Sequence, residues 1–260
     1  MKSKRFLIAI EFLGFRFHGV QSQSDYPSIQ GRVNECLKKA FHSQKFNTRF
    51  ASRTDAMVSA LDTYFVLMFD EAIDLSIVNE SLSYLPPDIK QRGVQVVSDD
   101  FIILNAVDHK TYRYYFSFNT YAHPFSAPFM TVLSEELDIE LMMKACDLFI
   151  GTHDFSNYCY KPKEGTQFIR TISCAKITTN NELTASFFPQ ESWYFEVSST
   201  GFMRGQVRLM MGALFRLGKN EISLNELSES LIKLNPQFVK WMAPPTGLIL
   251  HQTKLVLPDL

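Results

Sequence analysis

The sequence lacks several features that would place it in common classes of protein. It has no run of about 18 apolar residues, which a transmembrane helix requires, and its first residues show neither a long apolar segment nor a signal cleavage site. Its four cysteines include no CxxC pair, so neither a disulfide framework nor a zinc site is indicated. We therefore expect a cytoplasmic protein that has no metal site and does not associate with membranes.

An excess of positive charge is also missing. The formal net charge of −1 argues against a uniformly basic surface for nucleic acids, although it leaves room for a local basic cleft. One stretch, residues 201 to 220, holds four basic residues and no acidic one: Arg204, Arg208, Arg216 and Lys219. This run is either a solvated surface or one that holds anions. Arg204 and Arg208 are expected one turn apart on the same helix face.

What is present suffices for a large core, because 46% of the 260 residues are hydrophobic. Residues 1–104 are expected to form a ferredoxin-like domain with the order β-α-β-β-α-β. Its first helix shows apolar residues at helical spacing after Ser28, a residue suited to capping. The expected strands are 5–12, 46–51, 61–69 and 93–98, and the second helix is 74–85, ended by Pro86 and Pro87.

Residues 105–260 repeat this pattern without visible sequence identity. Strands are expected at 110–118, 170–179 and 192–200, and helices at 138–151, 202–218 and 224–234, with Gly151 and Gly218 just beyond two of the helices. The fold class is therefore α/β of the α+β kind: two ferredoxin-like or RRM-like halves with mainly antiparallel sheets side by side. Clefts between such halves are common ligand sites, so we expect the active site there.

Reactive side chains stand in the loop that leads into one apolar strand. The segment "SRTDAMVSA" (52 to 60) places Asp55 where a rigid scaffold displays functional groups. The guanidinium of Arg53, two residues away, favours the ionised carboxylate that a nucleophile requires. Taken alone, an R-T-D triplet is more often a turn with an Asx-type hydrogen bond.

Six separated stretches in the same order show a wider pattern, and together they resemble the TruA-type tRNA pseudouridine synthases. They are "IAIEFLGFRFHGVQSQ" (8 to 23), "SRTDAMVSA" (52 to 60), "KTYRYYF" (110 to 116), "GTHDFSNY" (151 to 158), "GFMRGQVRLMMGAL" (201 to 214) and "APPTGLIL" (243 to 250). The resemblance implies an enzyme that isomerises uridine to pseudouridine in tRNA, as expected in the anticodon stem-loop, without a metal or redox cofactor. It also implies a homodimer in which one tRNA contacts both subunits.

The resemblance assigns four catalytic residues: Asp55, Arg53, Tyr112 and Arg208. By this analogy Asp55 is the essential carboxylate, Arg208 pairs with it, and Tyr112 lies near the target base and assists proton removal. A flipped base needs an aromatic platform and cations for the flanking phosphates, which these residue types supply. For Tyr114, on the same strand face as Tyr112, core packing is the better interpretation.

Five further residues are expected to contact RNA: Arg16, His18, Gln21, Arg204 and Leu248. For His18 a hydrogen-bonded structural role explains the residue equally well. For Leu248, packing in the core explains the residue equally well.

The sequence departs from the family pattern at four positions. Met57 and Ser59 stand where the family usually has glycine and histidine, and Val20 and Leu209 stand where it has tryptophan and asparagine. We interpret these as changes in residues that face RNA, and hence as a hint of altered substrate choice. An RNA-binding module of the same fold without catalytic activity is the alternative, as is activity on another RNA or position.

Overall fold

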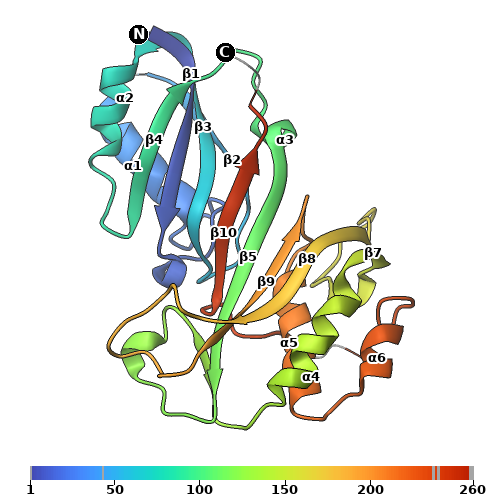
Figure 1. Cartoon of the computed structure of the whole chain (residues 1–260). Helices are drawn as coiled ribbons and strands as arrows, with labels where there is room; N and C mark the ends of the chain where they lie inside the picture. The colour runs from blue at the N-terminus through green and yellow to red at the C-terminus, as the bar shows by residue number, and fades with distance from the viewer. Residues whose placement is uncertain (1, 43, 236–237, 239–240, 258–260) are drawn as a thin grey trace. The chain divides into compact units, whose positions relative to one another are not determined.

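The computed structural model describes residues 2–42, 44–235, 238 and 241–257. The chain divides into two compact units, one formed by Met1–Asp108 with Leu250–Leu260 and the other by His109–Ile249 (Figure 1). The domain bounds expected from the sequence, 1–104 and 105–260, stay a prediction. Within the described ranges, no helix combines the length and apolar character that crossing a membrane requires.

The first unit has the expected order β-α-β-β-α-β, and its strands pair antiparallel. Strand β1 lies between β4 and β3, and β2 pairs with the middle of β3, residues 65–69. The elements are β1 (Lys2–Phe12), η1 (Gly14–Arg16), α1 (Ile29–Phe41), β2 (Phe46–Phe50), β3 (Ser59–Asp74), α2 (Leu75–Leu82), β4 (Ile89–Val96) and α3 (Ile103–Ala106). The last strand, β10 (Leu248–Leu255), begins in the second unit and continues into the first, where it neighbours β3.

Helix α1 shows why this unit folds as its sequence predicts. The Ser28 side chain accepts a hydrogen bond from Gly31 N at 3.1 Å, which satisfies one of the amides left open at the helix start. The apolar positions of α1 are buried, and Phe41 packs edge-on against Phe69 of β3, with 4.8 Å between the ring centres. Helix α2 ends at Leu82, earlier than expected, because a turn precedes the two prolines.

The second unit is also a mainly antiparallel α+β structure, so the expected fold class is confirmed. Its sheet order is β5-β9-β8-β7, with the short β6 parallel to β5. Helices α4 and α5 lie side by side, and α6 adjoins α5. The elements are β5 (Val107–Phe118), η2 (Pro124–Ser126), β6 (Thr131–Leu133), α4 (Ile139–Cys146), η3 (Asp147–Phe149), β7 (Gly151–Asp154), η4 (Ser156–Tyr158), β8 (Ile169–Thr179), β9 (Trp193–Ser199), α5 (Gln206–Gly218) and α6 (Leu224–Glu229).

Three expected helix bounds in this unit are wrong. Helix α4 ends at Cys146, and Gly151, at φ 111°, opens strand β7 instead of following a helix. Helix α5 begins at Gln206 and not at residue 202, because Gly205 before it has φ 70°, a left-handed conformation that breaks helical propagation. Gly218 is the last residue of α5, and α6 ends at Glu229.

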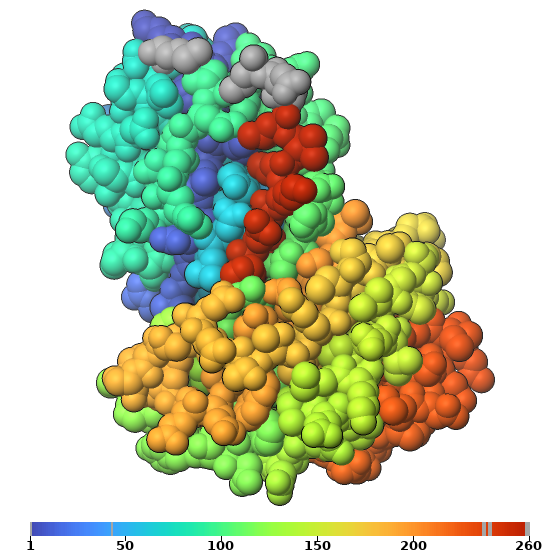
Figure 2. Space-filling view, in the orientation of Figure 1, coloured from blue at the N-terminus to red at the C-terminus, as the bar shows by residue number. Residues whose placement is uncertain are grey.

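Two long connections of the second unit meet through aromatic side chains. Phe187 belongs to the connection from β8 to β9, and His123 and Phe125 belong to the connection from β5 to β6. The centre of the Phe187 ring lies 6.0 Å from the centres of both other rings. Figure 2 shows the connection from β8 to β9, coloured orange, at the surface of this unit. Phe125 is 68% exposed, so these rings meet at the surface and not in a core.

Candidate active site

Two loops of the first unit hold Asp55. One loop precedes α1 and contains residues 14–20, and the other joins β2 to β3 and contains residues 51–58. Met57 N donates to Phe17 O at 2.9 Å, and Gly14 N donates to the Ser59 side chain at 2.9 Å. Asp55 is half-buried and lies two residues before Met57, the first of these anchors. Two motifs far apart in sequence therefore form one rigid support for the carboxylate.

Gly19 is a point of close approach between these two loops. It has φ 89°, and a Cβ at this position would collide with the carbonyl oxygen of Thr54. The absence of a side chain thus allows one loop to lie directly against the backbone beside Asp55. The hydroxyls of Ser52 and Thr54 are buried and have no hydrogen-bond partner among the residues that the structure describes.

Met57 takes a backbone conformation that normally favours glycine. Its φ is 65°, in the left-handed region, where a side chain costs roughly 1–2 kcal/mol. The hydrogen bond from Met57 N to Phe17 O fixes this conformation. The glycine that the family usually has at this position would fit this conformation, and Met57 carries strain beside Asp55.

Four other predicted residues of this unit lie at its surface. Arg53, His18 and Gln21 are exposed, and the His18 ring packs against Tyr26 with 4.4 Å between ring centres. Arg16 is exposed too, and its Nε donates to Asp88 Oδ2 at 3.0 Å. These placements are compatible with RNA contact, which stays a prediction for each residue.

In the second unit, strand β5 presents the predicted tyrosine. Tyr112 is 7% exposed and meets the Phe202 ring edge-on, with 5.3 Å between centres. Tyr114 is completely buried, and its hydroxyl contacts Thr131 Oγ1 at 2.7 Å and Pro244 O at 2.8 Å, so its interpretation as a core residue is confirmed. Lys110 precedes Tyr112 by two residues, and burial lowers the pKa of its ammonium group.

Arg208 is held by the segment that precedes β10. Its Nε donates to Ala243 O at 2.8 Å, while Ala243 N donates to Arg208 O at 3.1 Å. Gly212, one helical turn after Arg208, makes this possible, because a Cβ there would collide with Trp241 O. The guanidinium is thus fixed at one end by backbone atoms from a second predicted motif.

The expectation that Arg204 and Arg208 share one helix face is wrong. Arg204 lies before the helix, ahead of Gly205, and its guanidinium lies 5.3 Å from the centre of the Tyr160 ring. Leu248 is 5% exposed, so packing alone accounts for it, and contact with a base stays a prediction.

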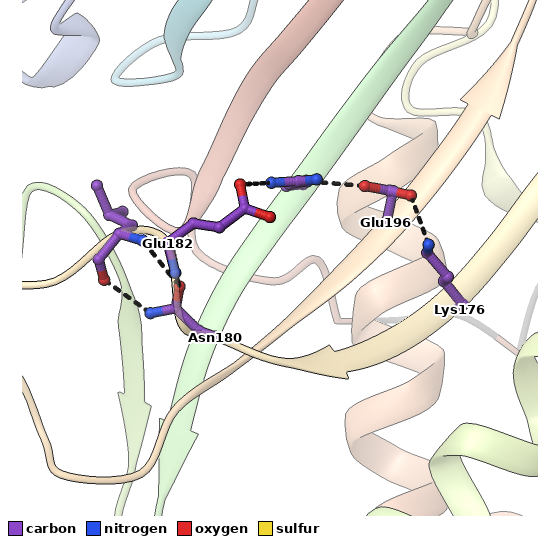
Figure 3. A network of polar contacts seen from close by, with 6 residues as sticks. Lys176, Asn180, Glu182 and Glu196 are labelled. Carbon is purple, nitrogen blue, oxygen red and sulfur yellow. Dashed lines mark hydrogen bonds and ion pairs between the residues drawn. The ribbon is translucent and has the colours of Figure 1, made fainter.

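Sequence reasoning missed the role of Arg113, the residue between the two tyrosines. Because side chains alternate along a strand, Arg113 points away from Tyr112 and Tyr114. It donates to Glu196 at 2.7 Å and to Glu182 at 2.6 Å, and Lys176 contacts the other oxygen of Glu196 at 3.2 Å (Figure 3). A buried arginine in a strand is a signal for such a partner, but the sequence does not show which carboxylates provide it.

Three of the four departures from the family pattern do not face RNA, which corrects the earlier interpretation. Val20, Ser59 and Leu209 are 2%, 6% and 6% exposed, and Ser59 accepts a hydrogen bond from Gly14 N. Only Met57 is partly exposed.

The chain is similar to known proteins over nearly its whole length. A sequence model described as tRNA pseudouridine synthase matches residues 145–254. The chain is 32% identical over 261 residues to the tRNA pseudouridine synthase A of Staphylococcus saprophyticus, with 98% of this chain and 92% of that protein covered. The proteins of the same name from Staphylococcus epidermidis and Lactobacillus acidophilus are 30% and 28% identical, with 98% and 95% of this chain and 92% of each relative covered.

Proposed function

The chain belongs to the tRNA pseudouridine synthase A family, and on this basis we propose that it isomerises uridine to pseudouridine in tRNA. In this reaction the bond between N1 of uracil and C1′ of ribose breaks, the base turns, and C5 bonds to C1′ instead. C5 loses its proton and N1 gains one, so the product has the same atoms as the substrate. The enzyme is therefore an isomerase.

Four residues carry the reaction in this proposal: Asp55, Arg53, Tyr112 and Arg208. Asp55 assists the detachment of uracil, because a carboxylate can attack C1′ or stabilise the positive charge that develops there. Arg53 and Arg208 favour its ionised form, since a cation near a carboxylate disfavours protonation. Tyr112 positions the flipped base and takes part in removing the proton from C5.

The observation that supports this proposal most strongly is the construction of the Asp55 loop. The backbone around Asp55 is anchored by the hydrogen bonds from Met57 N to Phe17 O and from Gly14 N to Ser59 Oγ. Gly19 packs directly against the carbonyl oxygen of Thr54, the residue before Asp55. Catalytic groups need such pre-organisation, because small displacements of a reacting group are costly. A turn with a purely local role would not require two anchored loops.

The position that the enzyme modifies in tRNA is also part of this proposal. The anticodon stem-loop is our proposed target, with Arg16, His18, Gln21, Arg204 and Leu248 as the proposed RNA contacts. Val20, Ser59 and Leu209 are buried, so their exchange supports continued core packing instead of a new substrate preference. The exposed residues of the loop before α1 remain available for RNA contact.

We also propose that the enzyme is a cytoplasmic homodimer in which one tRNA contacts both subunits. With a formal net charge of −1, a single chain offers few basic residues to a polyanion. Two copies double the basic stretch of residues 201 to 220 and with it the number of phosphates that can be neutralised. Light scattering of the purified protein, alone and with tRNA, tests this assembly.

Tritium release from tRNA labelled at C5 of uridine tests the function itself. The proposal predicts release by the wild-type protein, together with a new pseudouridine in the anticodon stem-loop when the product is mapped. Release accompanied by modification elsewhere would reject the proposed position. Binding of tRNA without release from any cellular RNA would show instead that the chain is an RNA-binding module.

A further inference from the structure

Basic side chains gather around Cys159 and Tyr160, at the start of the segment between η4 and β8. Lys161 Nζ and Arg204 Cζ lie 5.2 Å and 5.3 Å from the centre of its ring. Burial raises the pKa of the Cys159 thiol, and the charges of Arg170 and Arg204 oppose this, so Arg170 also lies close by. We call Tyr160, Lys161, Arg170 and Arg204 the Tyr160 cluster.

The positive charge of this cluster is not neutralised within the described part of the chain. None of its three basic residues forms an ion pair with a described carboxylate, whereas the exposed Arg16, Arg32 and Lys39 each have one. An aromatic ring attracts a cation through its quadrupole and leaves the net charge unchanged. The cluster therefore presents its charge to solvent, where it can attract an anion.

The cluster is also fixed in place. Tyr160 N donates to Arg204 O at 2.9 Å, which joins the two backbones. Lys161 has φ 47°, a left-handed conformation that turns the chain immediately after the tyrosine. Tyr160 is 41% exposed, so its ring can hold two cations at the surface of the protein. Holding long side chains in advance reduces the entropy lost when they bind a ligand.

We propose that the Tyr160 cluster binds phosphate groups of the RNA substrate and that Tyr160 holds Lys161 and Arg204 in the geometry for doing so. This inference rests on the proposed function and adds a binding surface to it. A polyanion fits better than a protein partner, because the cluster offers three cations that form no ion pair with a described carboxylate, and one aromatic ring. Phosphate contacts fix the position of an RNA without reading its sequence.

Three variants test the proposal with tRNA as the probe. In Lys161→Ala/Arg204→Ala, each lost phosphate contact reduces the slope of log affinity against log salt concentration by about 0.7–0.9. In Tyr160→Ala, we expect tRNA affinity to fall roughly 5-fold to 20-fold through loss of the two cation–ring contacts. Tyr160→Phe keeps the ring and should bind as the wild type does. For all three, KM should follow affinity while kcat stays unchanged.

The double variant Lys38→Ala/Tyr84→Ala is the matched control, because both residues are exposed and lie outside the cluster. Equal effects in the control and in the cluster variants would overturn the proposal, as would an unchanged salt dependence in Lys161→Ala/Arg204→Ala. Binding is measured directly, so the proposal is tested even if no tritium is released. If the wild type releases no tritium, the proposed function is rejected. If the cluster variants bind tRNA as the wild type does, only the proposal that the Tyr160 cluster binds phosphate groups is rejected.

Discussion

Arg208 and Ala243 are joined by two hydrogen bonds that run in opposite directions. The side chain of Arg208 donates to Ala243 O at 2.8 Å, and the backbone of Ala243 donates to Arg208 O at 3.1 Å. The guanidinium and the segment before β10 therefore fix each other. Because Gly212 lets Trp241 O approach the helix, the position of Arg208 depends on a residue that has no reactive group.

Gly212→Ala should consequently reduce catalysis. The new Cβ would push the backbone at Trp241 outward and break the pair of bonds at Arg208. A displacement of about 1 Å can cost roughly 100-fold in rate, so we expect kcat to fall by that order with little change in KM. Steady-state kinetics measure this. Gly93→Ala is the control, because a Cβ at Gly93 meets no atom within 4 Å.

Met57→Gly should stabilise the protein. The left-handed conformation at φ 65° costs methionine roughly 1–2 kcal/mol in the folded state, and glycine avoids this cost. Glycine is also more flexible in the unfolded chain, which offsets the gain by about 0.5–1 kcal/mol. We therefore expect the free energy of unfolding to rise by about 0.5–1 kcal/mol in urea denaturation. Met57→Ala keeps a Cβ and should give no gain. A decrease with glycine would show that the Met57 side chain contributes more through packing than its backbone costs.

Glu196→Gln should weaken the fold in a pH-dependent way. Burial alone would raise the pKa of Glu196, but hydrogen bonds from Arg113 and Lys176 outweigh it and hold the pKa below its usual value. A lowered carboxyl pKa gives stability that is present above the unfolded pKa, about 4.3, and is lost as pH falls through the folded value. The variant should therefore lose about 1–3 kcal/mol at neutral pH, and this difference should shrink in acid.

Glu182→Gln is the matched control for that measurement. Both carboxylates contact Arg113, but the Glu182 side chain is 59% exposed whereas that of Glu196 is 12% exposed. An exposed ion pair contributes little, because water screens it. Equal losses in the two variants at all pH values would contradict the role assigned to burial.

The secondary structure could be predicted from the sequence where capping residues and apolar spacing agree with the fold. Ser28 caps the first helix, whose apolar residues recur at helical spacing, and the first half follows the predicted alternation of strands and helices. In the second half the strands β6, β7 and β10 were not predicted. The limits of α5 could not be predicted, because the left-handed Gly205 reads like any small residue in an apolar helical pattern. That error placed Arg204 on the helix and concealed its contact with Tyr160, which is 44 positions away in the chain.

Predictions for the site succeeded at the level of motifs and failed at the level of single contacts. The loops around Gly19 and Asp55 were both identified, but nothing in the sequence indicates that Gly19 lies against Thr54 O. Likewise, Ser59 looked like an altered RNA contact until its hydrogen bond to Gly14 showed a structural role. Contacts between distant backbone segments depend on the assembled fold, so a linear pattern does not reveal them.

We propose that Asp55 performs the isomerisation and does not merely support the structure. The most direct test of this proposal is tritium release from C5-labelled tRNA by the wild type, Asp55→Ala and Asp55→Asn, combined with tRNA binding and thermal unfolding of each. We expect both variants to fold and to bind tRNA with nearly unchanged affinity but to release no tritium. Release at the wild-type rate by either variant would contradict the assignment of Asp55.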